Sequence, residues 1–154
     1  MFDDEGCTNI RHYIQSGNVV FEASAALAKK IPERIERAIL KQAKLTVPVV
    51  VRSQEEIASV VKGNPYLEKA KGNEIALHVA FLADTPDKKA VAALDPNRSP
   101  GDELVVKGKD IYLFCPNGIG RSKLTTGWFD SKLATTSTLR NWRTVITLEK
   151  MMGE

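Results

Sequence analysis

The stretch ELVVKGKDIYLFC, residues 103–115, decides the fold of the C-terminal half of this chain. Two runs rich in β-branched, aromatic and other apolar residues flank a polar segment, residues 107–110, whose glycine suits a tight turn. Strands joined by so short a turn pair antiparallel. The stretch therefore predicts a β-hairpin.

Further elements are predicted on both sides of this hairpin. They are a strand at residues 75–83, a short helix at 85–94 beginning at a proline, a helix at 120–133, a strand at 135–140 and a final helix from Asn141 to about residue 152. The order strand, helix, strand, strand, helix, strand is that of the split βαββαβ, or ferredoxin-like, unit. We therefore expect residues 63–154 to form one such unit with a terminal helix.

The first half repeats part of this order. It predicts a hairpin from residues 9–15 and 19–23, a helix at 25–45, a strand at 47–52 and a short connecting helix at 53–61. One strand and one helix placed before Met1 would complete the same unit. The predicted fold class is thus α+β, with two tandem ferredoxin-like units, the first (residues 1–62) incomplete at its N-terminus. Its sheet would have an unpaired edge open to pairing with another chain.

Composition sets broad limits on function. The chain has 154 residues, of which 43% are hydrophobic and 27% charged, with a net charge of +3, as expected for a globular protein. No apolar run is long enough to span a membrane. Cys7 and Cys115, the only cysteines, form neither a disulfide framework nor metal-ligand spacing, which favours a reducing cytoplasm. We expect no metal and no cofactor.

The segment NGIGRSKL, residues 117–124, is the main candidate site. If a helix begins near Gly120, its free amides and positive dipole favour an anion. Residues 115–145 carry five basic residues and one acidic residue, so positive charge is concentrated there. The predicted ligand-binding residues are Asn117, Gly118, Gly120, Arg121, Ser122, Lys123, Arg140 and Arg143. The alternative is a tight turn with a solvated basic surface, because Gly-x-Gly alone is a weak motif.

Arg140 and Arg143 flank a tryptophan in the string RNWRTV. Two arginines and an aromatic ring suit a stacked, phosphorylated ligand. The alternative is that Trp142 packs beneath the sheet, as most tryptophans do. In the ferredoxin-like order, Arg140 returns to the sheet end that Cys115 leaves, so we expect Arg140 or Arg143 near the Gly-rich loop, in one basic cluster.

Four strings resemble one family. They are YIQSGNVVF at residues 13–21, VPVVVR at 47–52, NGIGRSKL at 117–124 and RNWRTV at 140–145. Together they resemble the bacterial domain-of-unknown-function family 1697 over nearly the whole chain. The resemblance implies tandem α+β units. Family members typically open with a strand, a Gly-rich segment and a helix, which this sequence lacks. The family implies no activity, so it implies no catalytic residues.

Three functions are open at this point. The first is a module that binds a small phosphorylated or nucleotide-like anion through the Gly-rich loop and a basic cluster. The second is a single-stranded nucleic-acid-binding module, which would require Tyr112 and Phe114 to face solvent on an open sheet. Aromatic residues make up only 6% of the chain, which weakens that alternative. The third is an enzyme, although no triad, metal set or carboxylate pair is visible. The first two would use residues on different parts of the sheet.

Overall fold

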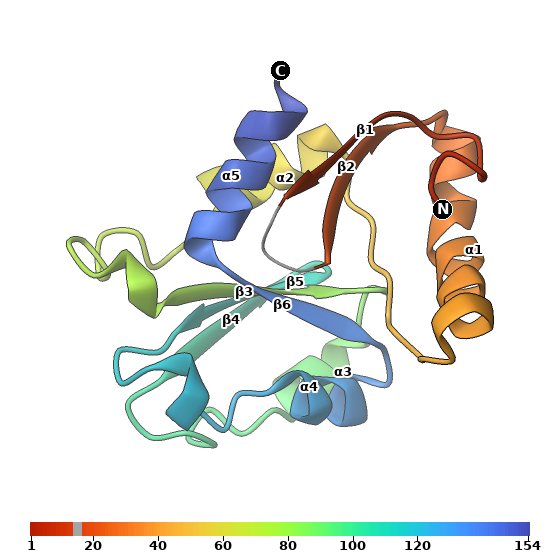
Figure 1. Cartoon of the computed structure of the whole chain (residues 1–154). Coiled ribbons are helices and arrows are strands. Elements are labelled where there is room, and N and C mark those ends of the chain that lie inside the picture. The colour runs from red at the N-terminus through yellow and green to blue at the C-terminus, as the bar shows by residue number, and fades with distance from the viewer. Residues whose placement is uncertain (14–16) are drawn as a thin grey trace.

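The computed structural model describes residues 1–13 and 17–154, and over these residues the chain is a mixed α+β protein with two antiparallel sheets and five α-helices (Figure 1). The strands are β1 (Thr8–Tyr13), β2 (Asn18–Glu22), β3 (Leu77–Leu82), β4 (Glu103–Lys107), β5 (Asp110–Phe114) and β6 (Ser137–Asn141). The α-helices are α1 (Ala25–Ala43), α2 (Gln54–Lys62), α3 (Lys88–Ala92), α4 (Thr126–Leu133) and α5 (Trp142–Met152). Two 3₁₀ turns, η1 (Glu74–Ala76) and η2 (Ile119–Arg121), precede β3 and α4.

The larger sheet has the strand order β4-β5-β3-β6, and every neighbouring pair is antiparallel. β3 is an interior strand that is buried along its whole length, in keeping with a sequence that is apolar except for His78. The predicted hairpin at residues 103–115 is confirmed as β4 and β5. Because β5 and β6 both run antiparallel to β3, their C-terminal ends lie at the same end of the sheet.

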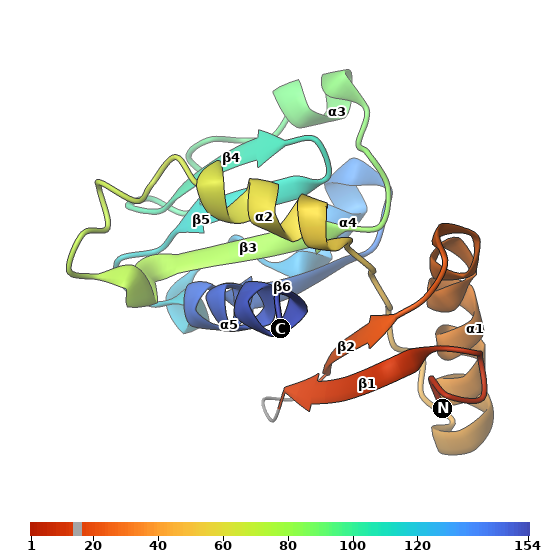
Figure 2. The same ribbon diagram turned by 90° about the horizontal axis from the view of Figure 1, so that it is seen from above.

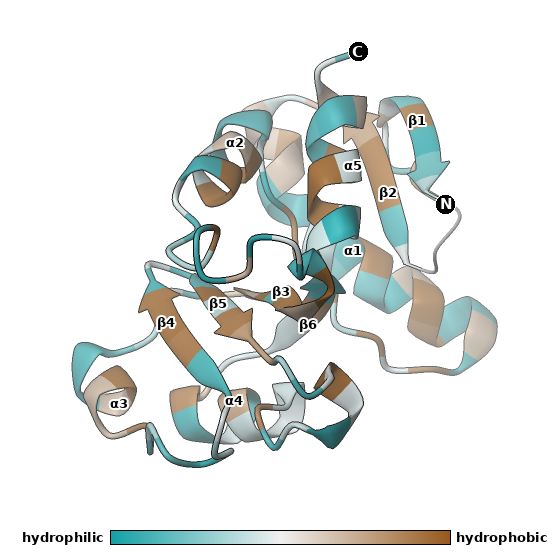
Figure 3. Ribbon diagram, turned by 90° about the vertical axis from the view of Figure 1, so that its left-hand side faces the viewer, coloured by the Kyte–Doolittle hydropathy of each residue, from teal (hydrophilic) through white to brown (hydrophobic). Residues whose placement is uncertain are grey.

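Helices cover both faces of this sheet (Figure 1). α2 and α5 lie on one face, where Ile57, Val60 and Val145 pack against alternate residues of β3 and β5. α3 and α4 lie on the other face, where Phe129 and Leu133 are buried. β4 and β5 are hydrophobic over most of their length, as two covered faces require (Figure 3). α2 therefore packs on the C-terminal sheet, although it follows the N-terminal elements in the chain.

The N-terminal elements form a smaller layer beside α5 (Figure 2). β1 and β2 pair only with each other among the described residues. α1 begins after Ser24, whose side chain accepts a hydrogen bond from the Leu27 amide. It packs Ile31 and Ile35 against this hairpin and against half-buried valines of the segment that follows it. The predicted hairpin and helix are confirmed, and the end of the first predicted strand and the first turn residue, at 14–16, lie outside the described residues.

The predicted strand at residues 47–52 is wrong. These residues belong to an irregular segment between α1 and α2 and pair with no strand in the described part of the chain. The Val49 amide instead donates to the Glu36 carboxylate at 2.9 Å. The alternating valines suit a strand, but a strand also needs a neighbour to accept its backbone hydrogen bonds. The sequence pattern could not reveal whether that neighbour was present.

The predicted helix at residues 120–133 begins later than expected. Its N-cap is Thr125, whose side chain accepts from the Trp128 amide, and the helix proper is α4. Residues 119–121 form η2, and Ser122 is extended. A hydroxyl at the cap position is a stronger start signal than glycine, so the helix forms from Thr126. The Gly-rich segment is consequently a loop that precedes the helix.

Candidate functional site

The candidate site is built from two loops at one end of the four-stranded sheet, residues 95–102 and 116–125, here named the paired loops. The first leads into β4, and the second leaves β5 and leads to α4. Three of the predicted side chains at this place, those of Asn117, Arg121 and Lys123, are exposed. Ser122 is buried. The site is therefore a surface with one buried hydroxyl beneath it.

Hydrogen bonds tie the paired loops together. The Lys123 amide donates to the Ser99 hydroxyl at 3.1 Å, and that hydroxyl donates to Asp102 at 2.7 Å. The Arg98 Nε atom donates to the Lys123 carbonyl at 3.4 Å. Gly101, at φ +91°, lets the Asn117 side chain approach, since a Cβ there would lie 3.3 Å from Asn117 Nδ2. The two loops thus form one surface.

Most amides of the Gly-rich segment are already bonded within the protein. The Arg121 amide donates to the Gly118 carbonyl and the Ser122 amide to the Ile119 carbonyl. The Leu124 amide donates to the Ser122 hydroxyl at 3.1 Å. These donors are not directed at a ligand, so the helix-terminus mechanism expected from the sequence loses its physical basis. Any anion at this place must be held by side chains.

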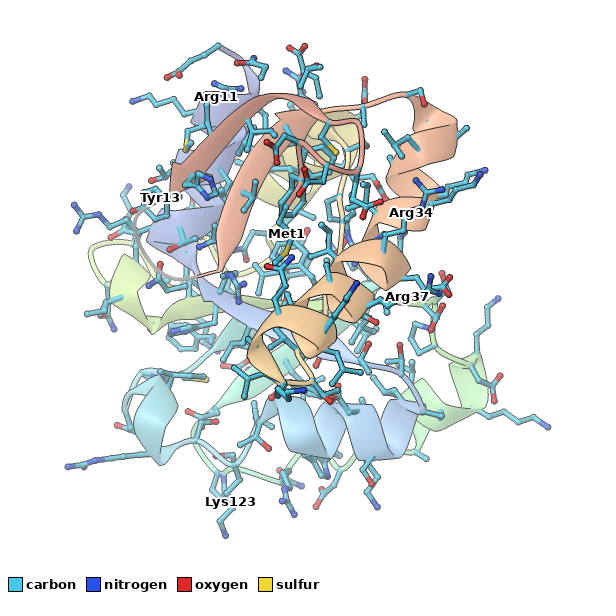
Figure 4. All side chains as sticks on the ribbon, turned by 45° about the vertical axis from the view of Figure 1, so that its right-hand side comes forward. Met1, Arg11, Tyr13, Arg34, Arg37 and Lys123 are labelled. Carbon is cyan, nitrogen blue, oxygen red and sulfur yellow. The ribbon has the colours of Figure 1, made fainter. Side chains whose placement is uncertain are left out.

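Three cations lie on the paired loops. The Lys123 side chain points away from the protein (Figure 4). In residues 1–13 and 17–154, neither Arg121 nor Lys123 forms an ion pair. Arg98 is the third, and its guanidinium lies 5.3 Å from the centre of the Trp128 ring. No local sequence pattern indicated Arg98, because its loop is separated from the Gly-rich segment by the β4–β5 hairpin.

Arg140 lies elsewhere. Its position in the backbone is at the sheet end predicted for it, because Arg140 pairs with Val79 near the start of β3 and Cys115 follows β5 at that same end. Its side chain, however, is on the face that α2 and α5 cover, whereas the Gly-rich loop packs on the other face through Ile119. The Arg140 guanidinium donates to Asn18 at 2.6 Å and to the Gly17 carbonyl at 3.3 Å. Arg140 therefore binds the β1–β2 hairpin, and the prediction that its guanidinium joins the Gly-rich loop is wrong.

Arg143 is also separated from the paired loops. It is exposed in the first turn of α5, on the same face as Arg140. Trp142 is buried beneath that helix, as its packing interpretation predicted. The residues brought together are thus Asn117, Gly118, Gly120, Arg121, Ser122 and Lys123, with Arg98 added. The structure does not bring Arg140 and Arg143 into that group.

The buried polar groups near the paired loops are not poised for nucleophilic chemistry. Burial raises the pKa of the Cys115 thiol to about 11, against a smaller lowering by Ser122, so the thiol is protonated at neutral pH. Burial lowers the pKa of His78, whose Nδ1 atom is buried without a protein partner. No group of three or more metal-ligating side chains occurs among the described residues.

Two surface depressions lie away from the paired loops. One, of about 310 Å³, lies between the start of α2 and the β4–β5 turn and is lined by Glu55, Glu56 and Asp110 among others. Burial raises the pKa of Asp110, while bonds from the Ser53 amide and Lys109 hold the pKa of Glu56 low despite its burial. Both carboxylates already have partners, so this pair is structural. The other, of about 270 Å³, is lined by Met1, Phe2, Asp3, Ile10 and His12.

The aromatic residues of β5 do not face solvent. Tyr112 and Phe114 are buried under α2 and α5, and the Tyr112 hydroxyl donates to the Val60 carbonyl at 2.9 Å. Burial also raises the pKa of Tyr112 to about 12. Single-strand recognition on an open sheet requires exposed rings. The geometry of β5 does not support that mode.

No helix in the described part of the chain is sufficiently long and apolar to span a bilayer.

Comparison with known proteins gives relatives but no activity. Residues 1–112 match the model of a family described as "Protein of unknown function (DUF1697)". No curated protein matches the chain. Among solved structures, the chain is similar to a conserved bacterial protein, SP0830 from Streptococcus pneumoniae, with 17% identity and a TM-score of 0.66. The match covers 99% of this chain and 85% of that one. At this identity the likeness shows the fold alone.

Proposed function

Since this chain belongs to the DUF1697 family of proteins of unknown function, we propose its role from its own geometry, as a protein that binds a small phosphorylated anion on the paired loops. The observation that carries the proposal is the presence of three basic side chains, Arg98, Arg121 and Lys123, on two loops hydrogen-bonded to each other. None of the three forms an ion pair with a described carboxylate.

Electrostatics supports an anionic ligand at this place. Arg121 and Lys123 are exposed, so water solvates their charges in the unliganded protein. Bringing an anion between like charges relieves their mutual repulsion and adds charge-assisted hydrogen bonds. The Ser122 hydroxyl, which was predicted to contact the ligand, accepts from Leu124 and is buried, so it supports the loop. Its role in the proposal is to position the two cations on either side of it.

Removing two of the cations should abolish binding. We expect pyrophosphate to raise the melting temperature of the native protein, because a ligand that binds only the folded state stabilises it by mass action. The double variant Arg121→Ala with Lys123→Ala should lose this shift while keeping the unliganded melting temperature, since both side chains are exposed. Differential scanning fluorimetry at constant ionic strength measures both quantities.

A matched control is available on the opposite face of the sheet. Arg143→Ala with Lys150→Ala removes the same charge from exposed positions of α5. This control should keep the pyrophosphate shift. Equal loss in both double variants would mean that the shift reports only net charge, and the proposal would then be abandoned.

The finer architecture is also proposed here. We infer two ferredoxin-like units divided near residue 62, the first of them incomplete. The order β4-β5-β3-β6 supports the second, because it is the order that the split βαββαβ unit produces. The N-terminal elements β1, β2 and α1 correspond to the strand, strand and helix that follow the first helix of a βαββαβ unit. A cytoplasmic location is proposed from Cys7 and Cys115, both buried as free thiols.

Self-association is a further proposal, carried by the two-stranded sheet. β1 and β2 each have one edge that pairs with no described strand, and such edges template pairing with another copy. We expect the mass measured by light scattering to exceed 17.0 kDa at high concentration and to return to it on dilution. A mass of one chain at every concentration would rule this out.

A further inference from the structure

Arg98 differs from the other two cations because its side chain is held in place. Its guanidinium carbon lies 5.3 Å from the centre of the Trp128 ring, and its Nε atom donates to the Lys123 carbonyl at 3.4 Å. Trp128 is itself fixed, with 8% of its surface exposed and its amide bonded to the Thr125 cap. A stacked and hydrogen-bonded guanidinium has little freedom left to lose when a ligand arrives.

The outer edge of that guanidinium is available. In residues 1–13 and 17–154, neither terminal nitrogen of Arg98 makes a hydrogen bond or an ion pair. Those two nitrogens form a planar fork that matches two oxygens of one oxyanion. A lysine ammonium has no such fork and acts as a point charge. Arg98 is therefore the only one of the three cations that the described contacts orient for two-point recognition.

We propose that Arg98 is the anchor of the site, receiving two oxygens of a phosphate group on its terminal nitrogens while Arg121 and Lys123 supply charge. This inference rests on the proposed function and names its recognition mode. Phosphate is favoured over carboxylate because it has a third acceptor oxygen, which remains for Lys123 or Arg121 after the fork is filled. Trp128 and the Lys123 carbonyl act as positioning groups for the anchor.

The test uses the two tryptophan indole N–H signals of the ¹⁵N-labelled full chain. Trp128 lies beneath Arg98, whereas Trp142 is buried on the opposite face of the sheet and serves as an internal control. We expect inorganic phosphate, added at constant ionic strength, to shift the Trp128 signal in a saturable manner and to leave Trp142 unchanged. Acetate at the same ionic strength should shift Trp128 with weaker affinity.

The variant Arg98→Lys tests whether the planar guanidinium matters beyond its positive charge. It keeps the positive charge but loses one charge-assisted hydrogen bond and the planar stack, so phosphate affinity should fall about 10-fold or more. Arg121→Lys keeps charge at a position with no described fork geometry and should retain affinity within about 3-fold. The melting temperature of the Arg98→Lys protein should fall only slightly, because Arg98 is exposed and its one described hydrogen bond is 3.4 Å long.

Each result decides between the two levels of the proposal. Native affinity in Arg98→Lys, with loss in the Arg121→Ala and Lys123→Ala double variant, would overturn the anchor and leave the proposed function standing. Equal affinity for acetate and phosphate would overturn the choice of phosphate. No saturable shift of Trp128 in the native protein would overturn both the anchor and the proposed site.

Discussion

Replacing Arg52 with alanine is expected to lower the free energy of unfolding by about 3–5 kcal/mol, because it leaves a buried carboxylate without its partner. The Arg52 side chain is 6% exposed, and its Nε atom donates to Asp110 at 3.2 Å. Its remaining nitrogens donate to three backbone carbonyls, those of Val51, Leu82 and Lys109. The guanidinium also lies 5.5 Å from the centre of the Phe81 ring. One side chain thus binds the segment before α2 to the end of the larger sheet, where β3 ends and β5 begins.

The deficit of the Arg52→Ala protein should shrink as the pH falls from 7 to 5. Burial raises the pKa of Asp110 above its ordinary value of 3.8, and Arg52 opposes that rise. Without Arg52 the pKa rises further, so the folded variant takes up a proton at a pH where the unfolded chain does not. A folded state that binds more protons gains stability on acidification. Urea denaturation of both proteins at several pH values in this range measures the effect.

Arg37→Ala is the control for this experiment. Arg37 pairs with Glu33 one turn away on the solvent side of α1, and both side chains are largely exposed (Figure 4). Exposed pairs of this kind contribute about 0.3–0.5 kcal/mol. A deficit in Arg52→Ala that is no larger than that of Arg37→Ala, or that grows on acidification, would contradict the role assigned to Arg52.

Replacing Arg140 with alanine is expected to cost about 2–3 kcal/mol, on the scale of hydrogen bonds to a charged group. The guanidinium donates to Asn18, to the Gly17 carbonyl and to the Leu139 carbonyl at 2.6, 3.3 and 2.8 Å. Asn18 is buried and lies 122 positions away in the chain. Arg140→Lys should recover little of the loss, because an ammonium cannot donate in the three directions of the planar guanidinium.

The loss should appear locally as well as globally. Hydrogen exchange of β2 amides should accelerate in Arg140→Ala, because the hairpin loses a described attachment to the C-terminal half and keeps that of Arg11, which donates to the Met151 carbonyl at 2.7 Å. Figure 4 shows Arg11 beside the end of α5. Arg143→Ala, two helical positions from the strand end and exposed, should change stability by less than about 0.5 kcal/mol. Unchanged exchange of β2 in Arg140→Ala would refute the fastening role.

Local patterns were sufficient for most elements of this fold. Apolar runs on both sides of Gly108 predicted β4 and β5. The helices predicted from residues 25, 53 and 141 form after the side-chain caps Ser24, Ser53 and Asn141. These features depend on contacts within a few residues, which a sequence displays directly. The capping box of Ser53 and Glu56 is the clearest example, since both of its hydrogen bonds are present.

Predictions failed where the deciding partner is distant in the chain. Residues 47–52 have strand-like valines but no neighbouring strand to receive their backbone hydrogen bonds, so they remain irregular. The missing neighbour cannot be read from the local pattern alone.

The late start of α4 has a local cause instead. Thr125 caps the helix five residues after Gly120, through a contact with the Trp128 amide three residues away. Two possible helix starts therefore compete within one short segment, and the hydroxyl cap prevails.

The sequence by itself determined most of the helices and strands, several helix caps and the concentration of basic residues around the Gly-rich segment, because each is a property of nearby residues. Only the tertiary structure decided which cations share a surface. Strand alternation sends Arg140 to the face of the sheet that α2 and α5 cover, where it meets Asn18. A hydrogen bond between loops on either side of the β4–β5 hairpin brings Arg98 to Lys123 instead. Both contacts join residues far apart in the chain, and folding alone makes them neighbours.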